Sequence, residues 1–113
     1  MHFSPNPLLH VAPAEPIEAE RLGAWLHETD PQIFRRLHGG DEALSRRHLA
    51  AQWTASAGLH SHVHATAAYR EGSLMGVAIG YDAHTLSAQE LPQFRCAIRT
   101  IGGRRALRMF GWW

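Results

Sequence analysis

Two strand-like runs joined by a tight turn limit what this chain can fold into more than any other feature. Residues 63–70 alternate loosely between polar and apolar types, and residues 74–81 are almost wholly apolar. Glu71-Gly72 stands between the two runs and is typical of a hairpin turn. The pattern predicts an antiparallel β-hairpin whose apolar second strand is central in its sheet. Gly76 and Gly80 in that strand predict a bulge or a close backbone approach.

A short strand and a first helix are expected near the N-terminus. Leu8 to Ala12 is an apolar run closed by Pro13. Pro16 suits the first position of a helix, where its missing N–H has no partner to lose. We expect this helix to reach Glu28. Its apolar stripe at helical spacing consists of Ala19, Leu22, Trp25 and Leu26.

Two more helices are expected before the hairpin. Asp30 before Pro31 predicts a capped helix start, and Gly39-Gly40 predicts its end. Asp41 predicts the cap of a third helix, which runs from about Glu42 to Ser56 and stops before Gly58. The side chains expected to face inward are Ile33, Phe34 and Leu37 in the second helix, and Leu49 and Trp53 in the third.

The C-terminal residues 83–113 are predicted to be helical and rich in arginine. Leu91, Phe94, Ile98 and Ile101 form an apolar stripe at helical spacing. Gly102-Gly103 breaks this helix, and Arg104 to Trp113 is expected to form another short amphipathic piece. The predicted fold class is therefore α/β of the α+β type: a short first strand, two to three helices, an antiparallel hairpin and a C-terminal helix.

Composition excludes several classes of protein. The 113 residues suffice for one domain, residues 1–113, and the formal net charge of +1 does not predict a nucleic-acid partner. The N-terminal residues lack the features of a secretory signal, and no apolar run is long enough to span a membrane. The single cysteine, Cys96, precludes an intramolecular disulfide. We therefore expect a soluble protein of a reducing compartment, in the cytoplasm.

Three histidines at alternate positions precede the hairpin: His60, His62 and His64. On a strand they would share one face, and imidazole is a good ligand for zinc or copper. Same-face neighbours on a strand are about 7 Å apart, however, so three of them converge poorly on one ion. The favoured interpretation is the polar face of the strand's start, and no metal ligand is assigned. A histidine-rich metal-binding module remains the alternative.

The order of these pieces resembles the N-terminal half of a GCN5-related N-acetyltransferase (the GNAT superfamily). The matching strings are LHVAPAEPIEAERLGAWL, HETDPQIFRRLHGG and HSHVHATAAYREGSLMGVAIGYD, within residues 7–82. Many members of the family share a first strand and helix, an "ETDP…F…LFG" segment, a strand, an acidic-Gly turn and a "vvGlalGY" strand. The resemblance implies the transfer of an acetyl group from acetyl-CoA to an amine, in a small molecule or a peptide.

The family's cofactor site lies after its fourth strand, in a Q/R-x-x-G-x-G/A loop. There the backbone N–H groups at a helix start bind the pyrophosphate of acetyl-CoA. The nearest string here is RTIGGR, residues 99–104, where Arg104 replaces the small residue and the preceding segment is predicted to be a helix. We therefore expect the chain to end before the cofactor site, to be inactive alone, and to bind acetyl-CoA weakly or not at all. No catalytic or cofactor-binding residue is assigned.

The resemblance places the acceptor pocket beside the loop between the first helices, roughly residues 27–40. It implies that Glu28 and Asp30 attract a cationic amine, that Phe34 forms a wall and that Tyr81 lines the cleft. The plainer roles are a solvated side chain for Glu28, a helix cap for Asp30 and core packing for Phe34. A sheet without its fourth strand would also expose an edge, which predicts self-association.

The C-terminal string RTIGGRRALRMFGWW offers a different function. Arginines beside Leu, Met, Phe and Trp are typical of segments that bind membrane surfaces or partner grooves. The favoured interpretation is a helix that packs onto the rest of an acetyltransferase domain. A membrane- or partner-binding module stays as the second alternative.

Overall fold

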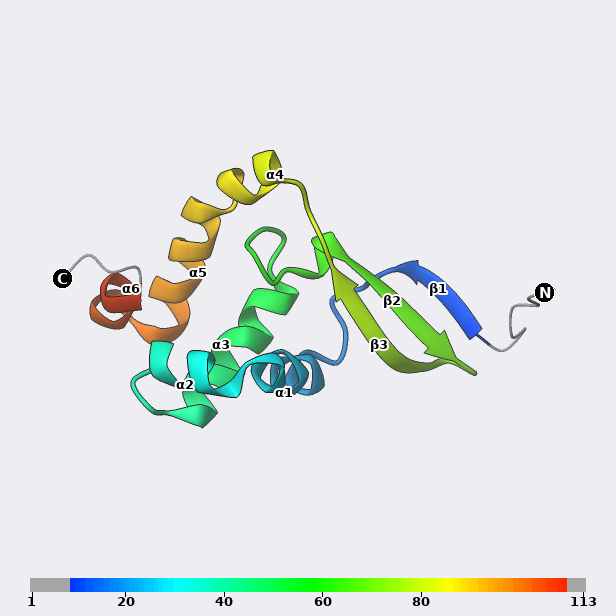
Figure 1. The fold of residues 1–113 in the computed structure, drawn as a ribbon, viewed down its shortest axis with the longest axis horizontal. Helices are drawn as coiled ribbons and strands as arrows, with labels where there is room; N and C mark the ends of the chain where they lie inside the picture. Colours follow the sequence, from blue (N-terminus) through cyan, green and yellow to red (C-terminus); the bar gives the residue numbers. More distant parts are fainter. Residues whose placement is uncertain (1–8, 110–113) are drawn as a thin grey trace.

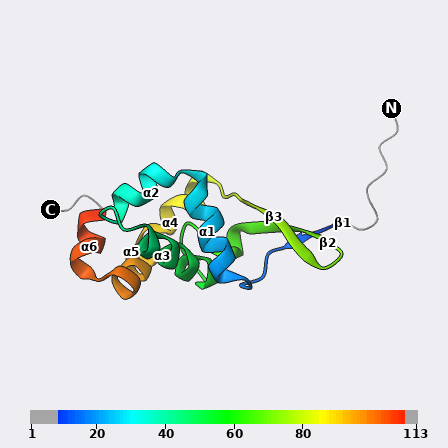
Figure 2. The same ribbon diagram turned by 90° about the horizontal axis from the view of Figure 1, so that it is seen from below.

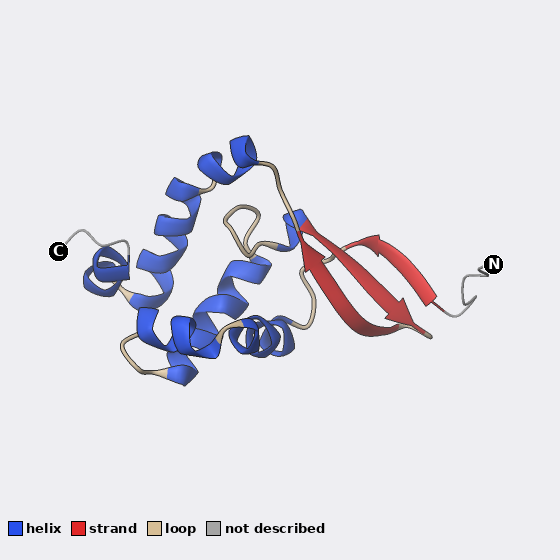
Figure 3. Cartoon of the chain, viewed as in Figure 1, coloured by secondary structure: helices blue, strands red, loops and turns tan. Residues whose placement is uncertain are grey.

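The computed structural model describes residues 9–109, which form an α+β fold with one antiparallel sheet (Figure 1). Figure 3 shows the strands gathered at one end of the molecule and the helices at the other. The strands are β1 (Leu9–Pro13), β2 (Ala65–Arg70) and β3 (Ser73–Ile79). The helices are α1 (Ala19–Thr29), α2 (Pro31–Leu37), α3 (Glu42–Thr54), α4 (Ala83–Ala88), α5 (Glu90–Ile101) and α6 (Gly103–Met109), with a 3-10 turn η1 (His62–His64).

The sheet has the order β1-β2-β3, with antiparallel pairing throughout. The predicted hairpin is confirmed, and Glu71 and Gly72 both take positive φ at its turn. The register shifts between Ala68 and Tyr69, opposite Gly76 and Leu74, which leaves Met75 as an extra residue in β3. A bulge next to Gly76 agrees with the prediction. The expected central position of the second strand is not seen, because β3 lies at an edge of the described sheet.

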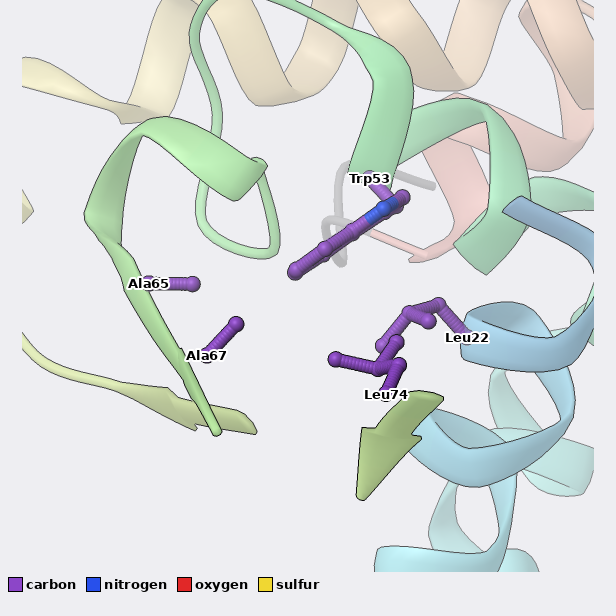
Figure 4. Close-up of a cluster of buried hydrophobic side chains, with 5 residues drawn as sticks. All are labelled: Leu22, Trp53, Ala65, Ala67 and Leu74. Carbon is purple, nitrogen blue, oxygen red and sulfur yellow. The ribbon is translucent and has the colours of Figure 1, made fainter. Parts of the chain in front are cut away.

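A small apolar core joins this sheet to the helices. It consists of Leu22, Trp53, Ala65, Ala67 and Leu74, drawn in Figure 4. The hairpin contributes Ala65, Ala67 and Leu74, α1 contributes Leu22, and α3 contributes Trp53, the largest of the five. The indole N–H of Trp53 also donates a hydrogen bond to the carbonyl oxygen of Ile17, at 2.9 Å. Trp53 therefore connects α3 to the segment between β1 and α1.

The helices α1 and α3 pack closely because Gly23 faces α3 without a side chain. A Cβ atom at Gly23 would lie 2.4 Å from the carbonyl oxygen of Arg46 and 2.9 Å from the Cβ of Ala50. The predicted start of α1 at Pro16 is wrong. Ile17 N–H donates to the carbonyl oxygen of Glu15, and Glu18 takes a left-handed φ of 54°, so helical geometry begins only at Ala19.

The two predicted aspartate caps are present. Asp30 accepts a hydrogen bond from the backbone N–H of Ile33, and Asp41 accepts one from that of Leu44. The prediction that Ile33, Phe34 and Leu37 of α2 face inward is wrong in part. Ile33 and Leu37 are exposed, and only Phe34 is partly buried. The predicted core pair of α3 is confirmed: Leu49 and Trp53 are both buried.

The C-terminal helices form a second core against α3. Its buried members are Leu44, Ala97, Ile101 and Ala106. The apolar stripe predicted for α5 is rotated from the observed buried face, because Leu91 and Ile98 are exposed. The buried residues of α5 are Gln93, Cys96, Ala97 and Ile101. The cause is Gln93, whose hydrogen bonds to α3 and the 58–61 loop turn this polar residue inward. The strand predicted at residues 8–12 is observed as β1, Leu9–Pro13. Residue 8 and the tryptophans at 112 and 113 lie outside the described residues.

The sheet and the helices α5 and α6 lie at opposite ends of the molecule in both views (Figures 1 and 2). The radius of gyration is 15.6 Å. A compact domain of this length is expected to have about 13 Å. Among residues 9–109, no helix is long and apolar enough to cross a membrane.

Candidate functional site

A candidate ligand pocket lies between the C-terminal half of α1 and strand β3. Its volume is about 480 Å³, within the range of small-molecule pockets. The wall is largely apolar, and its polar groups are Thr29, His60 and Tyr81. The apolar lining consists of Trp25, Leu26, Leu59, Met75, Gly76, Val77 and Ile79.

His60 lies at the junction of this pocket and a smaller one of about 200 Å³, since it lines both. The smaller pocket is also lined by Phe34, His38, His48 and Gln93. The ring of Phe34 meets that of His60 edge to face, with 5.7 Å between the centroids. Behind His60, a set of buried polar side chains continues into the helical part of the molecule.

These side chains form a continuous chain of hydrogen bonds, here called the histidine–glutamine chain, made of His60, Gln52, His48 and His38. His60 Nδ1 lies 2.7 Å from Gln52 Oε1, and Gln52 Nε2 lies 3.3 Å from His48 Nε2. His48 Nδ1 lies 2.8 Å from His38 Nε2, and His38 Nδ1 lies 2.7 Å from the carbonyl oxygen of Phe34. Gln93 joins the histidine–glutamine chain as a side branch, since its Nε2 donates to Gln52 Oε1 at 2.6 Å.

Backbone groups at both ends fix the direction of every donor in this chain. The Phe34 carbonyl can only accept, so His38 Nδ1 carries a proton and His38 Nε2 accepts from His48 Nδ1. At the other end, Leu59 N–H donates to Gln93 Oε1, so the amide of Gln93 donates to Gln52. Gln52 Oε1 is then the acceptor, and His60 Nδ1 donates to it. Both ends give the same assignment, in which His48 and His38 are neutral and His60 carries a proton on Nδ1.

The pKa values agree with neutral rings. Burial, together with the smaller effects of the neighbouring His38 and His60, lowers the pKa of His48 to about 4. Burial also lowers the pKa of His38 and of His60, although the Phe34 carbonyl partly opposes this at His38. A second proton on His38 or His48 would bring two N–H groups face to face. His60 therefore presents to the pockets a neutral ring whose Nε2 is free to accept a hydrogen bond.

Two of the residues expected in an acceptor site line these pockets. Tyr81 lines the larger one and is 37% exposed. Its ring packs edge to face on His64, with 5.2 Å between the centroids. Phe34 lines the smaller pocket, on the other side of His60. The α1–α2 junction and the end of the hairpin thus come together around His60.

The two expected acidic residues do not line either pocket. Glu28 lies on the exposed side of α1, where it accepts a hydrogen bond from Arg46 at 2.9 Å. Asp30 has the plainer role considered for it, because its carboxylate caps α2.

The three alternate histidines do not form one face of a strand. His62, Val63 and His64 form the turn η1, and β2 begins only at Ala65. Hydrogen bonds to residues distant in sequence stabilise this turn in place of the strand that the alternating pattern predicts. His62 Nδ1 donates to the Trp53 carbonyl, and the Ser61 hydroxyl donates to the Ala55 carbonyl. His60 bonds Gln52 and His64 packs on Tyr81, so the three rings point to separate partners.

The string RTIGGR lies across the junction of α5 and α6. Residues 99–101 end α5, Gly102 takes a φ of 90°, and α6 begins at Gly103. The helix predicted before the glycines is confirmed, and a strand–loop–helix phosphate site is not formed by these residues.

Sequence reasoning missed His38, His48, Gln52 and Gln93. His48 and Gln52 are four residues apart on α3, which places two polar side chains on the same face as the core residue Leu49. That pattern was the available signal, because a polar pair next to core positions indicates a buried hydrogen-bonded network.

Comparison with known proteins gives no match: no family model, no curated protein and no solved structure is significantly similar to this chain.

Proposed function

We propose that this chain carries the N-terminal, acceptor-binding part of a GNAT-type N-acyltransferase, which transfers an acetyl group from acetyl-CoA to an amine. The observation that carries the proposal is the topology. The antiparallel order β1-β2-β3, with helices between β1 and β2 and a tight hairpin between β2 and β3, agrees with what the resemblance implies. A reducing, cytoplasmic compartment belongs to the proposal and suits the buried free Cys96.

The pocket between α1 and β3 supplies the acceptor site of this proposal. Its apolar wall would hold the carbon skeleton of the amine, and His60 Nε2 would accept a hydrogen bond from the amino group. Tyr81 stands at the same wall. The cofactor would be bound by segments that follow a fourth strand of the sheet, so residues 9–109 need only position the acceptor.

Amine binding can be tested by following the NMR spectrum during titration with hexylamine, with hexanol as the uncharged analogue. We expect the signals of Trp25, Tyr81 and His60 to shift with hexylamine, and less with hexanol. Gly76→Val should weaken binding at least tenfold, because Gly76 lines the pocket and a Cβ there meets no atom within 4 Å. Gly80→Val is the matched control, since Gly80 has equal space and does not line the pocket. Equal effects of the two variants would contradict the acceptor site.

Cofactor binding tests the extent of the domain. We expect isothermal titration with acetyl-CoA to give no micromolar binding. Micromolar binding would show that a cofactor site is already present and would contradict the assignment to the N-terminal part. A reading frame that continues past residue 113 into a strand and a Q/R-x-x-G-x-G/A loop would support it.

Self-association through the edge of β3 is part of the same proposal, because a further strand would pair there. We expect sedimentation to give a mass that rises with concentration. Ala78→Lys should reduce this rise, since a charge on an exposed edge strand opposes pairing. Thr66→Lys places the same charge opposite it, on the central strand. A monomer at all concentrations, or equal effects of both lysines, would contradict the edge contact.

A further inference from the structure

A second polar cluster lies on the opposite side of α1 from the pocket, where α1 meets α3. It contains His27 and Glu28 from α1 and Glu42 from α3. One ligand atom from each, an imidazole nitrogen and two carboxylate oxygens, lie within 4.8 Å of one another. Within residues 9–109, these three are the histidine, cysteine or acidic side chains that gather in this way. They are distinct from the three alternate histidines.

His27 is the residue that distinguishes this cluster from a chance meeting of surface acids. Its side chain is 0% exposed, and its Nε2 has no hydrogen-bond partner although it is buried. A buried ring nitrogen without a partner is costly, and it calls for a proton acceptor, a donor or a metal ion. Nδ1, the other ring nitrogen, lies 2.8 Å from the hydroxyl of Ser45. When Nδ1 donates to this hydroxyl, Nε2 has its lone pair free, as in metal-binding histidines.

The contact between His27 and Glu42 has the dimensions of two ligands on one ion. Nε2 lies 3.2 Å from Glu42 Oε1, but the two are not aligned as a hydrogen bond. Two ligands at about 2.0–2.1 Å from a zinc ion, at tetrahedral to right angles, lie roughly 3.0–3.4 Å apart. In that geometry the nitrogen lone pair points to the ion and makes an angle of about 40° with the line joining the two ligands. A misaligned contact of this length fits two ligands that share one ion.

A cation already holds the two carboxylates together. Arg46 Nη2 lies 2.9 Å from Glu28 Oε1 and 3.3 Å from Glu42 Oε1. Its side chain is 41% exposed and can move into solvent without unfolding α3. The carboxylates are likewise accessible, at 59% for Glu28 and 51% for Glu42. A divalent ion would replace the guanidinium between the two carboxylates. It would also bind the lone pair of His27 Nε2, which the arginine, a donor only, cannot do.

We infer that His27, Glu28 and Glu42 form a binding site for a divalent transition-metal ion of the zinc type, which Arg46 occupies in competition with the metal. One imidazole and two carboxylates suit such ions, with water in the remaining position. Magnesium is excluded as the preferred ion, because imidazole is a poor ligand for it.

The test is isothermal titration of the untagged chain with Zn²⁺, together with Co²⁺ followed by its visible absorption. We expect one tight equivalent, an affinity at least tenfold weaker in Glu42→Gln, and an affinity several-fold tighter in Arg46→Ala. Both changes are at exposed side chains, and circular dichroism confirms that the variants fold. Glu18→Gln is the matched control, because Glu18 forms a similar exposed pair with Arg21 away from any histidine.

The two variants separate this site from general zinc binding by the chain's nine histidines. General binding would leave Glu42→Gln equal to Glu18→Gln, and that result would overturn the inference. A purely structural ion-pair cluster would make Arg46→Ala bind zinc no better than the native chain, which would also overturn it. Mg²⁺ should give no tight equivalent, and tight Mg²⁺ binding would refute the assigned ion class.

Discussion

The sheet end and the helical end of this molecule are held together by different kinds of contact. Around Trp53, the hairpin meets α1 and α3 mainly through apolar side chains. Around His48, α3 meets α2, α5 and the 58–61 loop through buried histidines and glutamines, which lie beside the apolar cluster of Leu44, Ala97, Ile101 and Ala106. The first contact depends on area removed from water, and the second on complete hydrogen bonding. The two ends should therefore respond differently to loss of volume and to protons.

Truncation of Trp53 is expected to have the largest effect on the sheet end. Trp53→Ala removes the largest buried side chain and its hydrogen bond to Ile17, and should lower the free energy of unfolding by about 3–5 kcal/mol. Urea unfolding measures the loss, and hydrogen exchange should show β2 and β3 opening before α5. Trp25→Ala is the control, since Trp25 is only partly buried and should cost less. Equal losses would contradict the central place of Trp53.

Acid should act first on the helical end. The folded state keeps His48 neutral down to a pKa of about 4, whereas the unfolded chain takes up a proton near 6.5. The stability is therefore complete above 6.5 and is lost as the pH falls toward 4, by roughly 3 kcal/mol for this group. The lowered pKa values of His38 and His60 act in the same direction.

Hydrogen exchange at pH 7 and at pH 4.5 would locate this acid effect. The amides of α3 and α5 should lose protection at pH 4.5, while those of β2 and β3 keep more of theirs. His48→Gln should flatten the dependence on pH at the cost of stability at pH 7. Uniform loss of protection across both ends would contradict the distinction between them.

The contact between α1 and α3 joins the sheet end to the helical end, and a substitution there is expected to have a smaller effect on stability. Gly23→Ala should lower the free energy of unfolding by about 1–3 kcal/mol, because the new Cβ would lie 2.4 Å from the Arg46 carbonyl oxygen. Alanine usually stabilises a helix relative to glycine, so the sign itself is informative. Gly103→Ala in α6 is the control, where a Cβ meets no atom within 4 Å. Thermal unfolding should separate the two variants.

Helix caps should give the smallest effects. Asp41→Ala should cost about 1 kcal/mol, since Asp41 bonds the Leu44 N–H at 3.0 Å at the start of α3. Asp30→Ala should cost less, because its bond to the Ile33 N–H is 3.4 Å long and α2 has no buried residue of its own. A larger loss for Asp30 in urea unfolding would indicate that α2 contributes more to the helical end than its contacts indicate.

The same contrast decides what the sequence could predict. The hairpin, the three helices before it and the pair Leu49–Trp53 follow from apolar spacing and turn residues, and all are observed. The inward face of α5 could not be found in this way. Gln93 is polar, and only its partners Gln52 and Leu59, distant in sequence, make its burial favourable. The turn at His62 has the same cause, since its partner is the carbonyl of Trp53.

The residues of the candidate site likewise fall into those that a local sequence pattern predicts and those that only the fold brings together. Tyr81 and Phe34, expected from the resemblance, line the two pockets beside His60. His60 itself was noticed in a run of histidines, but its role depends on Gln52, which no local pattern connects to it. Spacing finds residues that share an element, whereas a network that joins α2, α3, a loop and α5 requires the fold.

The one-way order of donors in the histidine–glutamine chain has a consequence for how this protein can vary. His48 and His38 each accept from one neighbour and donate to the next, and Gln52 accepts from both His60 and Gln93 and donates to His48. The Phe34 carbonyl and the Leu59 N–H, at the two backbone ends, cannot exchange roles. A substitution at residue 38, 48, 52 or 93 leaves at least two neighbouring groups without their hydrogen-bond partner, and one at residue 60 removes a donor from Gln52. Residues 38, 48, 52, 60 and 93 should therefore change as a set in related chains or not at all, with apolar side chains replacing all five together when they do.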